Sequence, residues 1–480
     1  MHNVADFQLG RRSAQTSTKD ATIWSDISQN DFRENLVELE RRTNAVPMDV
    51  LVAPVIHDSF TETDVLPLSV ERQVADDLAY VAAVSEGAQS VAAVCLEQHI
   101  GSKLLVRVAG MDVMDAKIRA MLDKTARLLE SAATLLQQAE TWKEQMFALI
   151  TEQHSQKLLG RMRSAKWQKP AYLRKTHKKP LVRDFENLSH RVQHAYPSKS
   201  ELKTRKTLVD AILVLSKEYE RFESTNLKVE IHDLKLLVRS THDWCRNPHV
   251  RAFASKLDSI TSPTPQVAAA VKTLRQLEKI GAYWRIASNL VDTARKFPRS
   301  FRRIEIKHVV PYAETPTEIA HESWAKVLHV HAEVQLVVEY AIEQQKDKAD
   351  NLEKGETASS VIWPRTIGTS KYLCYLCYLF LREHGGFGHA LSSHGRLFDQ
   401  WTVPDLEDYD HETRDQLAQV LFRMNDCVVR HTEKLGETIV WRPEPMTSRQ
   451  NLLADLDISK EVVADEEVND KLSSMSVTAA

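Results

Sequence analysis

The spacing of hydrophobic residues changes from helical to strand-like in the first quarter of the chain. The helical spacing is carried by Leu78, Val81, Ala82 and Val84. Two apolar runs follow at 90–96 and 104–108, and residues 99–102, which include a glycine, separate them. Short apolar runs bounded by a turn signal are typical of paired strands. The pattern therefore predicts a helix followed by a β-hairpin.

Strand and helix patterns return after residue 301. Residues 327–330 predict a short apolar strand, and helical spacing begins directly after it. Residues 361–368 predict a strand that ends at a glycine turn. Ser370 suits the N-cap position of the helix that follows this turn.

The last patterned part of the chain is a long helix and a strand. Helical spacing over 406–435 stops at Gly436, and residues 438–441 predict a final strand. We expect the hairpin at 90–108 to pair with strands near residues 327, 362, 390 and 440. The predicted fold class is α/β, a mixed sheet flanked by helices, with strands from two separate parts of the chain.

The region 111–300 lies between these parts and carries no strand signal. Its apolar helix faces include Leu208, Ile212, Leu215 and Tyr219. We expect a mainly α-helical insertion here, between a first segment of the α/β domain at 30–110 and a second at 301–444. Polar residues fill 1–29 and acidic residues are frequent in 445–480, so both ends are predicted to be disordered.

Composition narrows the class of protein only slightly. The chain has 480 residues, 43% hydrophobic content and a net charge of −3 at pH 7, which suits two or three domains and gives no global charge preference for a partner. Residues 1–18 lack the apolar core of a secretory signal, and no apolar run approaches the length of a membrane span. Five scattered cysteines form no disulfide framework. These features favour an intracellular protein, cytoplasmic or nuclear rather than secreted.

Two short motifs indicate a specific chemistry: His331-Ala332-Glu333 and Cys374-Tyr375-Leu376-Cys377. One histidine and two thiolates supply three zinc ligands and leave the fourth tetrahedral position open for water. An open zinc site makes water acidic enough to react near neutral pH. Glu333 is no ligand in this scheme and would carry protons as the general acid and base.

Both motifs fall at the predicted starts of helices. His331 and Glu333 open the helix that follows 327–330, and the cysteines follow Ser370. The partial positive charge of a helix N-terminus favours thiolate over thiol and hydroxide over water. The local structure that we expect therefore suits the chemistry of the motifs.

At these residues the chain resembles the cytidine-deaminase-like superfamily and, within it, the fungal, OTT-type family of predicted deaminases. The resemblance is carried by Val330-His331-Ala332-Glu333, by Ile367-Gly368-Thr369-Ser370-Lys371 leading into the cysteines, and by Ser393-His394-Gly395-Arg396-Leu397 with Trp401 and Pro404. It is densest from about residue 304 to residue 442. The chain departs from many superfamily members at Leu373, where they have proline before the first cysteine.

The resemblance implies a deaminase-like fold, which begins with a helix and a β-hairpin, and Zn2+ as the cofactor. The implied reaction is hydrolytic deamination of a cytosine- or adenine-type base in a nucleoside, a nucleotide or a single-stranded nucleic acid. His331 and the two cysteines would hold the metal, and Glu333 would be catalytic. The resemblance also makes His394 and Trp401 candidates for contact with the substrate or with the metal ligands.

Three other interpretations stay open at this point. A closed zinc ribbon could use Cys374, Cys377, His384 and His389, which would leave His331 and Glu333 without a role. A catalytically inactive scaffold could keep the deaminase fold and its zinc while the helical part binds a partner. A nucleic-acid-binding protein could keep a purely structural zinc. An intact Glu333 argues against the last two, since neither needs a proton carrier.

The segment 157–206 of the helical region is rich in cations. Aromatic residues are interleaved with them, namely Trp167, Tyr172, Phe185 and Tyr196. Cations neutralise phosphates and aromatic faces stack on unpaired bases, so this segment is a candidate site for a single strand of nucleic acid. Lys175, Lys178 and Lys179 are the candidate contacts. A solvated loop or an interdomain surface is the simpler alternative.

Overall fold

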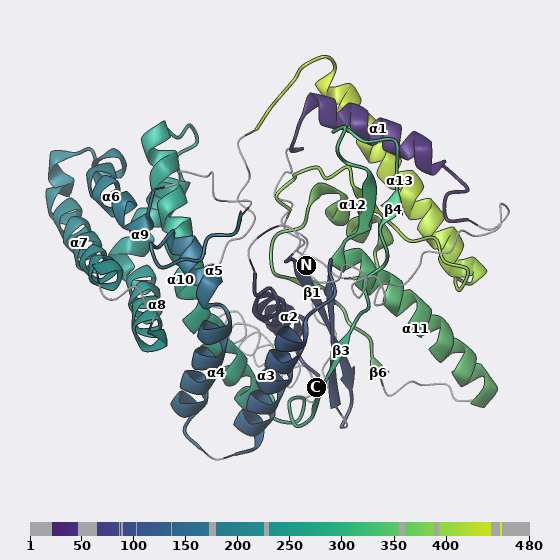
Figure 1. Ribbon diagram of the computed structural model, residues 1–480, viewed down its shortest axis with the longest axis horizontal. Helices are drawn as coiled ribbons and strands as arrows, with labels where there is room; N and C mark the ends of the chain where they lie inside the picture. The colour runs from purple at the N-terminus through teal and green to yellow at the C-terminus, as the bar shows by residue number, and fades with distance from the viewer. Residues whose placement is uncertain are drawn as a thin grey trace, which may run out of the picture. The chain divides into compact units, whose positions relative to one another are not determined.

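The computed structural model describes residues 22–46, 65–85, 87, 90–101, 103–135, 137–171, 179–224, 230–354, 361–387, 393–442 and 452–453. The chain forms a mixed α/β structure that divides into two compact units (Figure 1). The first unit comprises Met1–Lys157 and Ile286–Ser448, and the second comprises Leu158–Arg285 and Arg449–Ala480. Within the described part of the chain, no helix combines the length and the hydrophobicity that a bilayer crossing requires.

The main sheet of the first unit is built on the predicted hairpin. Strands β1 (Ala92–His99) and β2 (Lys103–Gly110) pair antiparallel, with Val94 opposite Val108. β3 (Ile304–His308) adds parallel to β2, and β6 (Val361–Ile362) and β7 (Gly368–Thr369) add antiparallel to β1. The strand order is β3-β2-β1-β6, with β7 also on β1. The predicted hairpin and the mixed sheet are therefore confirmed.

Helices cover both faces of this sheet (Figure 1). α11 (Ala332–Lys354) packs on β1 and β2, and α2 (Leu68–Ala82) packs on β1 and β7. α3 (Ala116–Thr134) lies against β3, and α4 (Ala139–Gln153) packs on α3. Because β1 is covered on both faces, its hydrophobic residues are buried without alternation, and Ala93, Val94, Cys95 and Leu96 are fully inaccessible to solvent.

A second, smaller sheet contains the strand at 327–330. β5 (Val327–Val330) pairs antiparallel with β4 (Thr315–Pro316) and parallel with β8 (Trp401–Thr402). The prediction that residues near 327 pair with the hairpin is therefore wrong, because both edges of β5 are occupied by β4 and β8.

The predicted strand at 438–441 is also wrong. Residues 438–442 form no strand, and the backbone N–H of Val440 donates to the carbonyl of Arg42 at the end of α1 (Gln29–Arg42). Ile439 and Trp441 are 69% and 61% exposed. The segment follows α13 (His411–Leu435), and its backbone bonds to the end of a helix instead of to a strand. The position near 390 lies outside the described residues.

The hydrophobic core around α11, α12 (Tyr375–His384) and α13 also reaches into the predicted N-terminal arm. Ile23 is fully buried, and Trp24 packs against Phe32 of α1 with ring centroids 5.8 Å apart. Thr22 and Ile23 also donate hydrogen bonds to the carboxylate of Asp405. Residues 22–29 are thus folded, and 1–21 lie outside the described residues. α1 and α13 lie side by side (Figure 1).

The second unit consists of packed helices. They are α6 (Leu181–Ala195), α7 (Leu202–Ser224), α8 (Ile231–Arg246) and α9 (Pro248–Asp258), together with most of α10 (Pro265–Lys296). Phe185 and Tyr219 join α6 to α7, with ring centroids 5.1 Å apart. The Tyr219 hydroxyl lies 2.9 Å from the hydroxyl of Thr241 on α8. This unit is all-helical in its described residues.

Two residues of the predicted C-terminal tail belong to the second unit. Leu452 and Leu453 are 2% and 3% exposed, and the backbone N–H of Leu453 donates to the buried carboxylate of Glu278.

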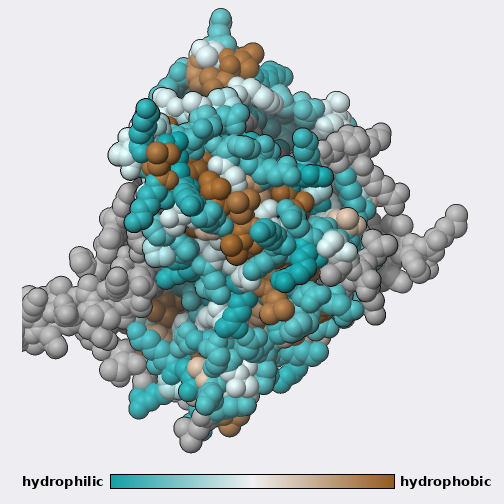
Figure 2. All heavy atoms as spheres, turned by 90° about the vertical axis from the view of Figure 1, so that its left-hand side faces the viewer, coloured by the Kyte–Doolittle hydropathy of each residue, from teal (hydrophilic) through white to brown (hydrophobic). Residues whose placement is uncertain are grey.

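On the molecular face drawn in Figure 2, hydrophobic residues are interspersed among hydrophilic ones. Scattered hydrophobic residues are normal on a protein surface and indicate no binding site by themselves.

Glu40 on α1 is an acid in an unfavourable position. Burial raises its pKa to about 7, and the neighbouring charges of Asp399 and Glu322 act in the same direction. One carboxylate oxygen of Glu40 is buried without a hydrogen-bond partner among the described residues. Ionisation of Glu40 therefore costs folding free energy.

Replacing Glu40 with glutamine is expected to stabilise the protein more as the pH rises. The folded wild type holds a proton that the unfolded chain has lost between about pH 4.5 and 7, so its stability falls through this window and levels off above it. The gain from Glu40→Gln at pH 8 should be on the order of 1–3 kcal/mol, and smaller at pH 5.5, by urea unfolding. Glu38→Gln on the same helix is the control, because hydrogen bonds from Arg42 and Arg41 lower the Glu38 pKa. Equal gains from Glu40→Gln at both pH values would contradict this account.

Candidate active site

His331 lies where β5 ends and α11 begins. Its backbone carbonyl accepts the hydrogen bond from the Gln335 N–H at 3.0 Å, so His331 is the residue that caps the helix. Glu333 follows in the first turn and is 4% exposed. The side-chain amide of Gln335 donates to the carbonyls of Gly110 and Val330, at 3.0 and 2.9 Å. Gln335, which the sequence did not single out, thus ties the start of α11 to the end of β2.

Cys374 caps α12, and Cys377 lies in its first turn. The Cys374 sulfur accepts the backbone N–H of Cys377 at 3.4 Å. The prediction that Ser370 caps this helix is wrong. Ser370 instead pairs with Ala92 of β1, donating its N–H to the Ala92 carbonyl at 3.0 Å and accepting the Ala92 N–H at its hydroxyl at 3.1 Å.

The ligand atoms of His331, Cys374 and Cys377 converge. His331 Nδ1 lies 3.6 Å from Cys374 Sγ and 3.4 Å from Cys377 Sγ, and all three atoms lie within 4.8 Å of one another. Zinc bonds of about 2.3 Å to sulfur and about 2.0–2.1 Å to nitrogen, at tetrahedral angles, place S and N about 3.6 Å apart. The three residues therefore fit a single tetrahedral metal ion.

Glu333 lies beside this group without belonging to it. Its Oε2 is 3.5 Å from Cys377 Sγ. Burial raises the pKa of Glu333, against the opposing effect of His331. A carboxyl group that gains a proton more easily than usual suits a residue that accepts and returns one.

The two cysteines differ in their electrostatics. Burial alone would raise the pKa of Cys374, but the hydrogen bonds from Cys377 and the charge on His331 hold it well below its ordinary value. Burial and the neighbouring Cys374 raise the pKa of Cys377. One thiol of the pair is therefore ready to ionise, and the second would lose its proton when a cation binds.

His394 lies close to the metal-ligand group. Its ring Nδ1 accepts the backbone N–H of Arg396 at 3.1 Å, and its backbone N–H donates to the Leu373 carbonyl at 3.0 Å. Burial lowers the pKa of His394, so its ring is neutral and carries its proton on Nε2. Phe398, which the sequence did not single out, packs between the rings of His331 and His394, at 6.1 and 6.3 Å.

Trp401 is a core residue. It is 1% exposed and packs against Phe32 and Phe380 at 6.3 and 5.7 Å. Its indole N–H has no well-formed hydrogen bond among the described residues, and it lies close enough to the Cys377 sulfur to lower that thiol's pKa. This position suits contact with a metal ligand rather than with a substrate.

The closed ribbon does not fit the geometry. His384 lies at the end of α12, about 15 Å along the helix from Cys374. Its Nδ1 accepts the Gly386 N–H, and its ring packs on Phe380 and Phe387. His384 and Cys374 therefore cannot share a metal ion. His389 lies outside the described residues.

Much of the basic segment 157–206 serves the fold itself. Lys157 is 7% exposed and donates to the Ala83 carbonyl, and Arg163 pairs with Asp184. Phe185 and Tyr196 are buried in the helical core, so they do not present free faces to bases. Lys179 is exposed, whereas Lys175 and Lys178 lie outside the described residues.

Comparison with known proteins bears on the segment that carries this site. Residues 330–405 match the model of the OTT_1508-like deaminase family. These residues are a deaminase-family segment. It contains His331, Glu333, Cys374 and Cys377, and also His394, Phe398 and Trp401. No curated protein and no solved structure matches the chain.

Metal content tests the ligand set of the deaminase segment. Purified protein is expected to carry about one zinc per chain, and His331→Ala or Cys374→Ser should lose it, because two ligands hold zinc far more weakly than three. His384→Ala should keep the metal, since His384 lies outside the ligand group. Measurement is by elemental analysis after dialysis. Zinc retained in His331→Ala but lost in His384→Ala would contradict the assignment.

Proposed function

We propose that this deaminase-family chain is a zinc-dependent hydrolase that removes the exocyclic amino group of a nucleobase. The substrate class is a cytosine- or adenine-type base in a nucleoside, a nucleotide or a single-stranded nucleic acid. One observation carries the proposal: His331, Cys374 and Cys377 converge as a three-ligand group beside a buried carboxylate, Glu333, that is not needed as a ligand.

The ligand residues would hold Zn2+, which when bound acts as a Lewis acid and makes water a nucleophile near neutral pH. Three protein ligands leave one tetrahedral position for that water. The helix N-termini at His331 and Cys374 add partial positive charge, which stabilises the thiolates.

Glu333 would carry the protons of the reaction. Its carboxylate accepts a proton from the attacking water and delivers it to the ring nitrogen next to the amino-bearing carbon. The second water proton reaches the departing amino group, so the products are the oxo base and ammonia. Burial excludes bulk water from Glu333, and this strengthens its effect on the developing charge.

His394 and Phe398 are the residues that we assign to the substrate side. The neutral ring of His394 offers an Nε2–H donor, and Phe398 is a half-buried aromatic ring beside His331 with the Arg396 guanidinium over it, 5.2 Å from its centroid. Trp401 would donate to the Cys377 thiolate and so orient a metal ligand, in the way that outer hydrogen bonds commonly support metal sites.

Glu333→Gln tests the proposed chemistry. The amide keeps the size of the side chain but cannot shuttle a proton, so turnover should fall by a factor on the order of a hundred or more while zinc content is kept. Activity is measured as ammonia release and base mass change across cytosine and adenine nucleosides, nucleotides and single strands. Asp350→Asn, an exposed change on the same helix, is the matched control and should keep full activity. A zinc-loaded wild type that converts no member of the panel would favour a scaffold.

Salt dependence tests whether the substrate is a polymer. If the segment 157–206 binds a single strand, affinity should fall steeply with salt, and replacing Lys175, Lys178 and Lys179 together should weaken binding and flatten the slope. Binding is measured by fluorescence anisotropy at several salt concentrations. Undetectable binding at low salt would leave a nucleoside or nucleotide as the substrate.

A further inference from the structure

Two adjacent residues of β1 take part in separate buried charge networks. Glu97 and Gln98 are 4% and 5% exposed. Successive side chains of a strand point to opposite faces, so Glu97 faces α11 and Gln98 faces α2. Among the residues that the structure describes, the hydrogen-bond partners of Glu97 and Gln98 lie outside the metal-ligand group, and neither network has a role in the proposed chemistry.

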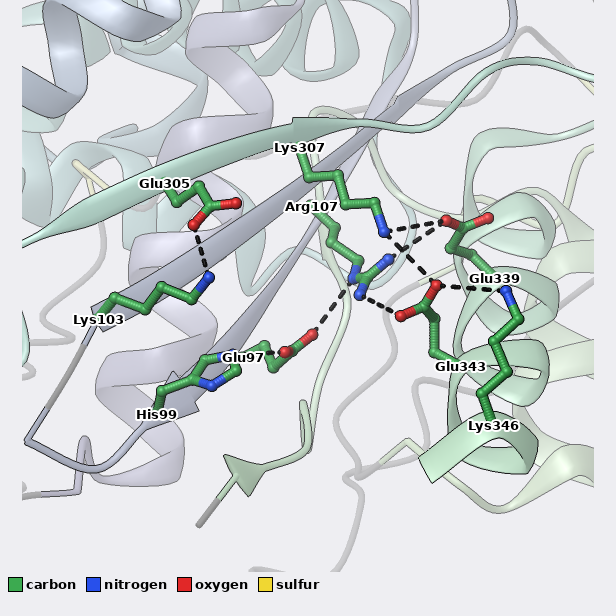
Figure 3. Close-up of polar contacts among 9 residues, drawn as sticks. All are labelled: Glu97, His99, Lys103, Arg107, Glu305, Lys307, Glu339, Glu343 and Lys346. Atoms are coloured by element: carbon green, nitrogen blue, oxygen red, sulfur yellow. Dashed lines mark hydrogen bonds and ion pairs between the residues drawn. The ribbon is translucent and has the colours of Figure 1, made fainter. Parts of the chain in front are cut away.

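The first network joins the hairpin to α11 (Figure 3). Arg107 of β2 is buried, and its guanidinium binds three carboxylates. Nε is 3.3 Å from Glu97, Nη1 is 3.2 Å from Glu339, and Nη2 is 3.2 Å from Glu343. The guanidinium also lies over the ring of Tyr340, 5.0 Å from its centroid. Glu339 and Glu343 are one helical turn apart on α11, so Arg107 grips one face of that helix.

The second network joins β1 to the segment that leads to the cysteines. Glu71 of α2 is fully buried and accepts both the backbone N–H and the Nε–H of Arg365, at 2.9 and 2.8 Å. The Gln98 amide donates to the same carboxylate at 3.4 Å. Gln98 also accepts the Leu66 N–H at 2.8 Å. Arg365 is thereby bound directly to Glu71 of α2 and, through that carboxylate, to Gln98 of β1.

Each network leads by a rigid path to one half of the ligand group. α11 begins at the His331 cap and carries Glu333 in its first turn. From Arg365 the chain passes Gly368 and Ser370, which are held on α2 and β1, and reaches Cys374. A Cβ atom at Gly368 would lie 2.1 Å from the Ala75 backbone, so this path has no slack.

Stability alone does not explain these networks. Replacing a buried ion cluster with apolar residues of similar volume is often neutral or stabilising, because the desolvation cost of the charges disappears. Directed hydrogen bonds do, however, hold α11 in one register against the hairpin. A shift of α11 by one residue would rotate the helix by about 100° and move it by about 1.5 Å along its axis. Apolar contacts tolerate such a shift more easily than the three ion pairs of Arg107, whose donors and acceptors would no longer meet. A shift of this size would remove Glu333 and His331 from the cysteines.

We propose that Arg107 and Arg365 are positioning residues that hold the two halves of the metal site to one strand, β1. Arg107 sets the register of the helix that carries His331 and Glu333. Arg365 sets the path of the segment that carries Cys374 and Cys377. The inference rests on the proposed function only for the identity of the metal, and its test does not require turnover.

The test replaces the first network with apolar residues. The triple variant Glu97→Met, Arg107→Met, Glu339→Met keeps side-chain volume, and Glu343 keeps Lys307 and Lys346 as partners. We expect its unfolding midpoint to stay at or above the wild-type value while zinc affinity, measured by chelator competition, falls about 10–100-fold. A Co2+-loaded sample should also show a changed visible spectrum, because the ligand geometry is altered. Once a substrate has been found, the triple variant should show a large fall in kcat and a smaller change in KM.

Lys103→Met is the matched control. Lys103 of the same hairpin pairs with Glu305 of β3 at 2.6 Å, and this pair lies apart from the carboxylates of α11 (Figure 3). Zinc affinity should therefore stay at the wild-type value. A folded triple variant with wild-type zinc affinity and Co2+ spectrum would overturn the proposal. If the triple variant does not fold, Arg107→Lys replaces it, because lysine keeps the charge but has one compact ammonium in place of the planar fork whose three nitrogens each bind a different carboxylate. Unchanged zinc affinity in Arg107→Lys would then overturn the proposal.

The second network is tested separately by Glu71→Gln with Arg365→Met. Weaker zinc binding is again expected, and combining both sets of changes should multiply the two fold-changes, because each acts on a different half of the site. Unchanged affinity in this variant would overturn the role of Arg365. Weakened zinc binding without any detectable deamination by wild type would support the positioning role while refuting the proposed reaction.

Discussion

Strand β1 is paired on both edges and covered on both faces, and the arrangement of the first unit depends on this. β2 occupies one edge, β6 and β7 share the other, and α11 and α2 cover the faces. A strand in such a position has no freedom to slip, since a shift by one residue would exchange its two buried faces. The segments that pack on β1 are therefore held in fixed positions. Two of them, α11 and the segment that contains β7, lead to the residues of the metal-ligand group.

The ligand group also depends on where two helices begin. His331 and Cys374 cap α11 and α12, so the unpaired N–H groups of both helices point towards one region. These N–H groups carry partial positive charge, which lowers the free-energy cost of burying the thiolates of Cys374 and Cys377 side by side. The arrangement explains how a chain of near-neutral net charge can concentrate electrostatic effects at one point.

Patterns local in sequence gave the reliable predictions. The hairpin at β1 and β2 has two apolar runs and a turn, and both motifs lie at true helix starts. Pairings between distant segments were less predictable. The run at 327–330 looks like any short strand, and nothing in it specifies β4 and β8 as partners. The run at 438–441 has strand-forming residues, but its backbone bonds to the end of α1.

Interleaved cations and aromatic residues were also ambiguous. Phe185 and Tyr196 follow helical spacing that buries them, so core packing competes with base stacking for the same residue types. The sequence around Phe398 does not mark it as a site residue, apart from its position near His394. Backbone hydrogen bonds from the surrounding loop to distant residues, such as Leu373 and Asn44, place it there. Serine is a favoured residue type at helix N-caps, but the hydroxyl and the backbone N–H of Ser370 hydrogen-bond to Ala92 of β1 instead of capping α12.

The contact of Gly368 with the backbone of Ala75 has a consequence for inherited variation in this chain. A single added methyl group there meets main-chain atoms, which cannot rotate away as a side chain would. Even a Gly368→Ala change would have to push β7 off α2, although it removes no charge, no hydrogen-bonding side chain and no ligand. A loss of metal in such a variant would look unexplained to anyone inspecting only the residues around the ion.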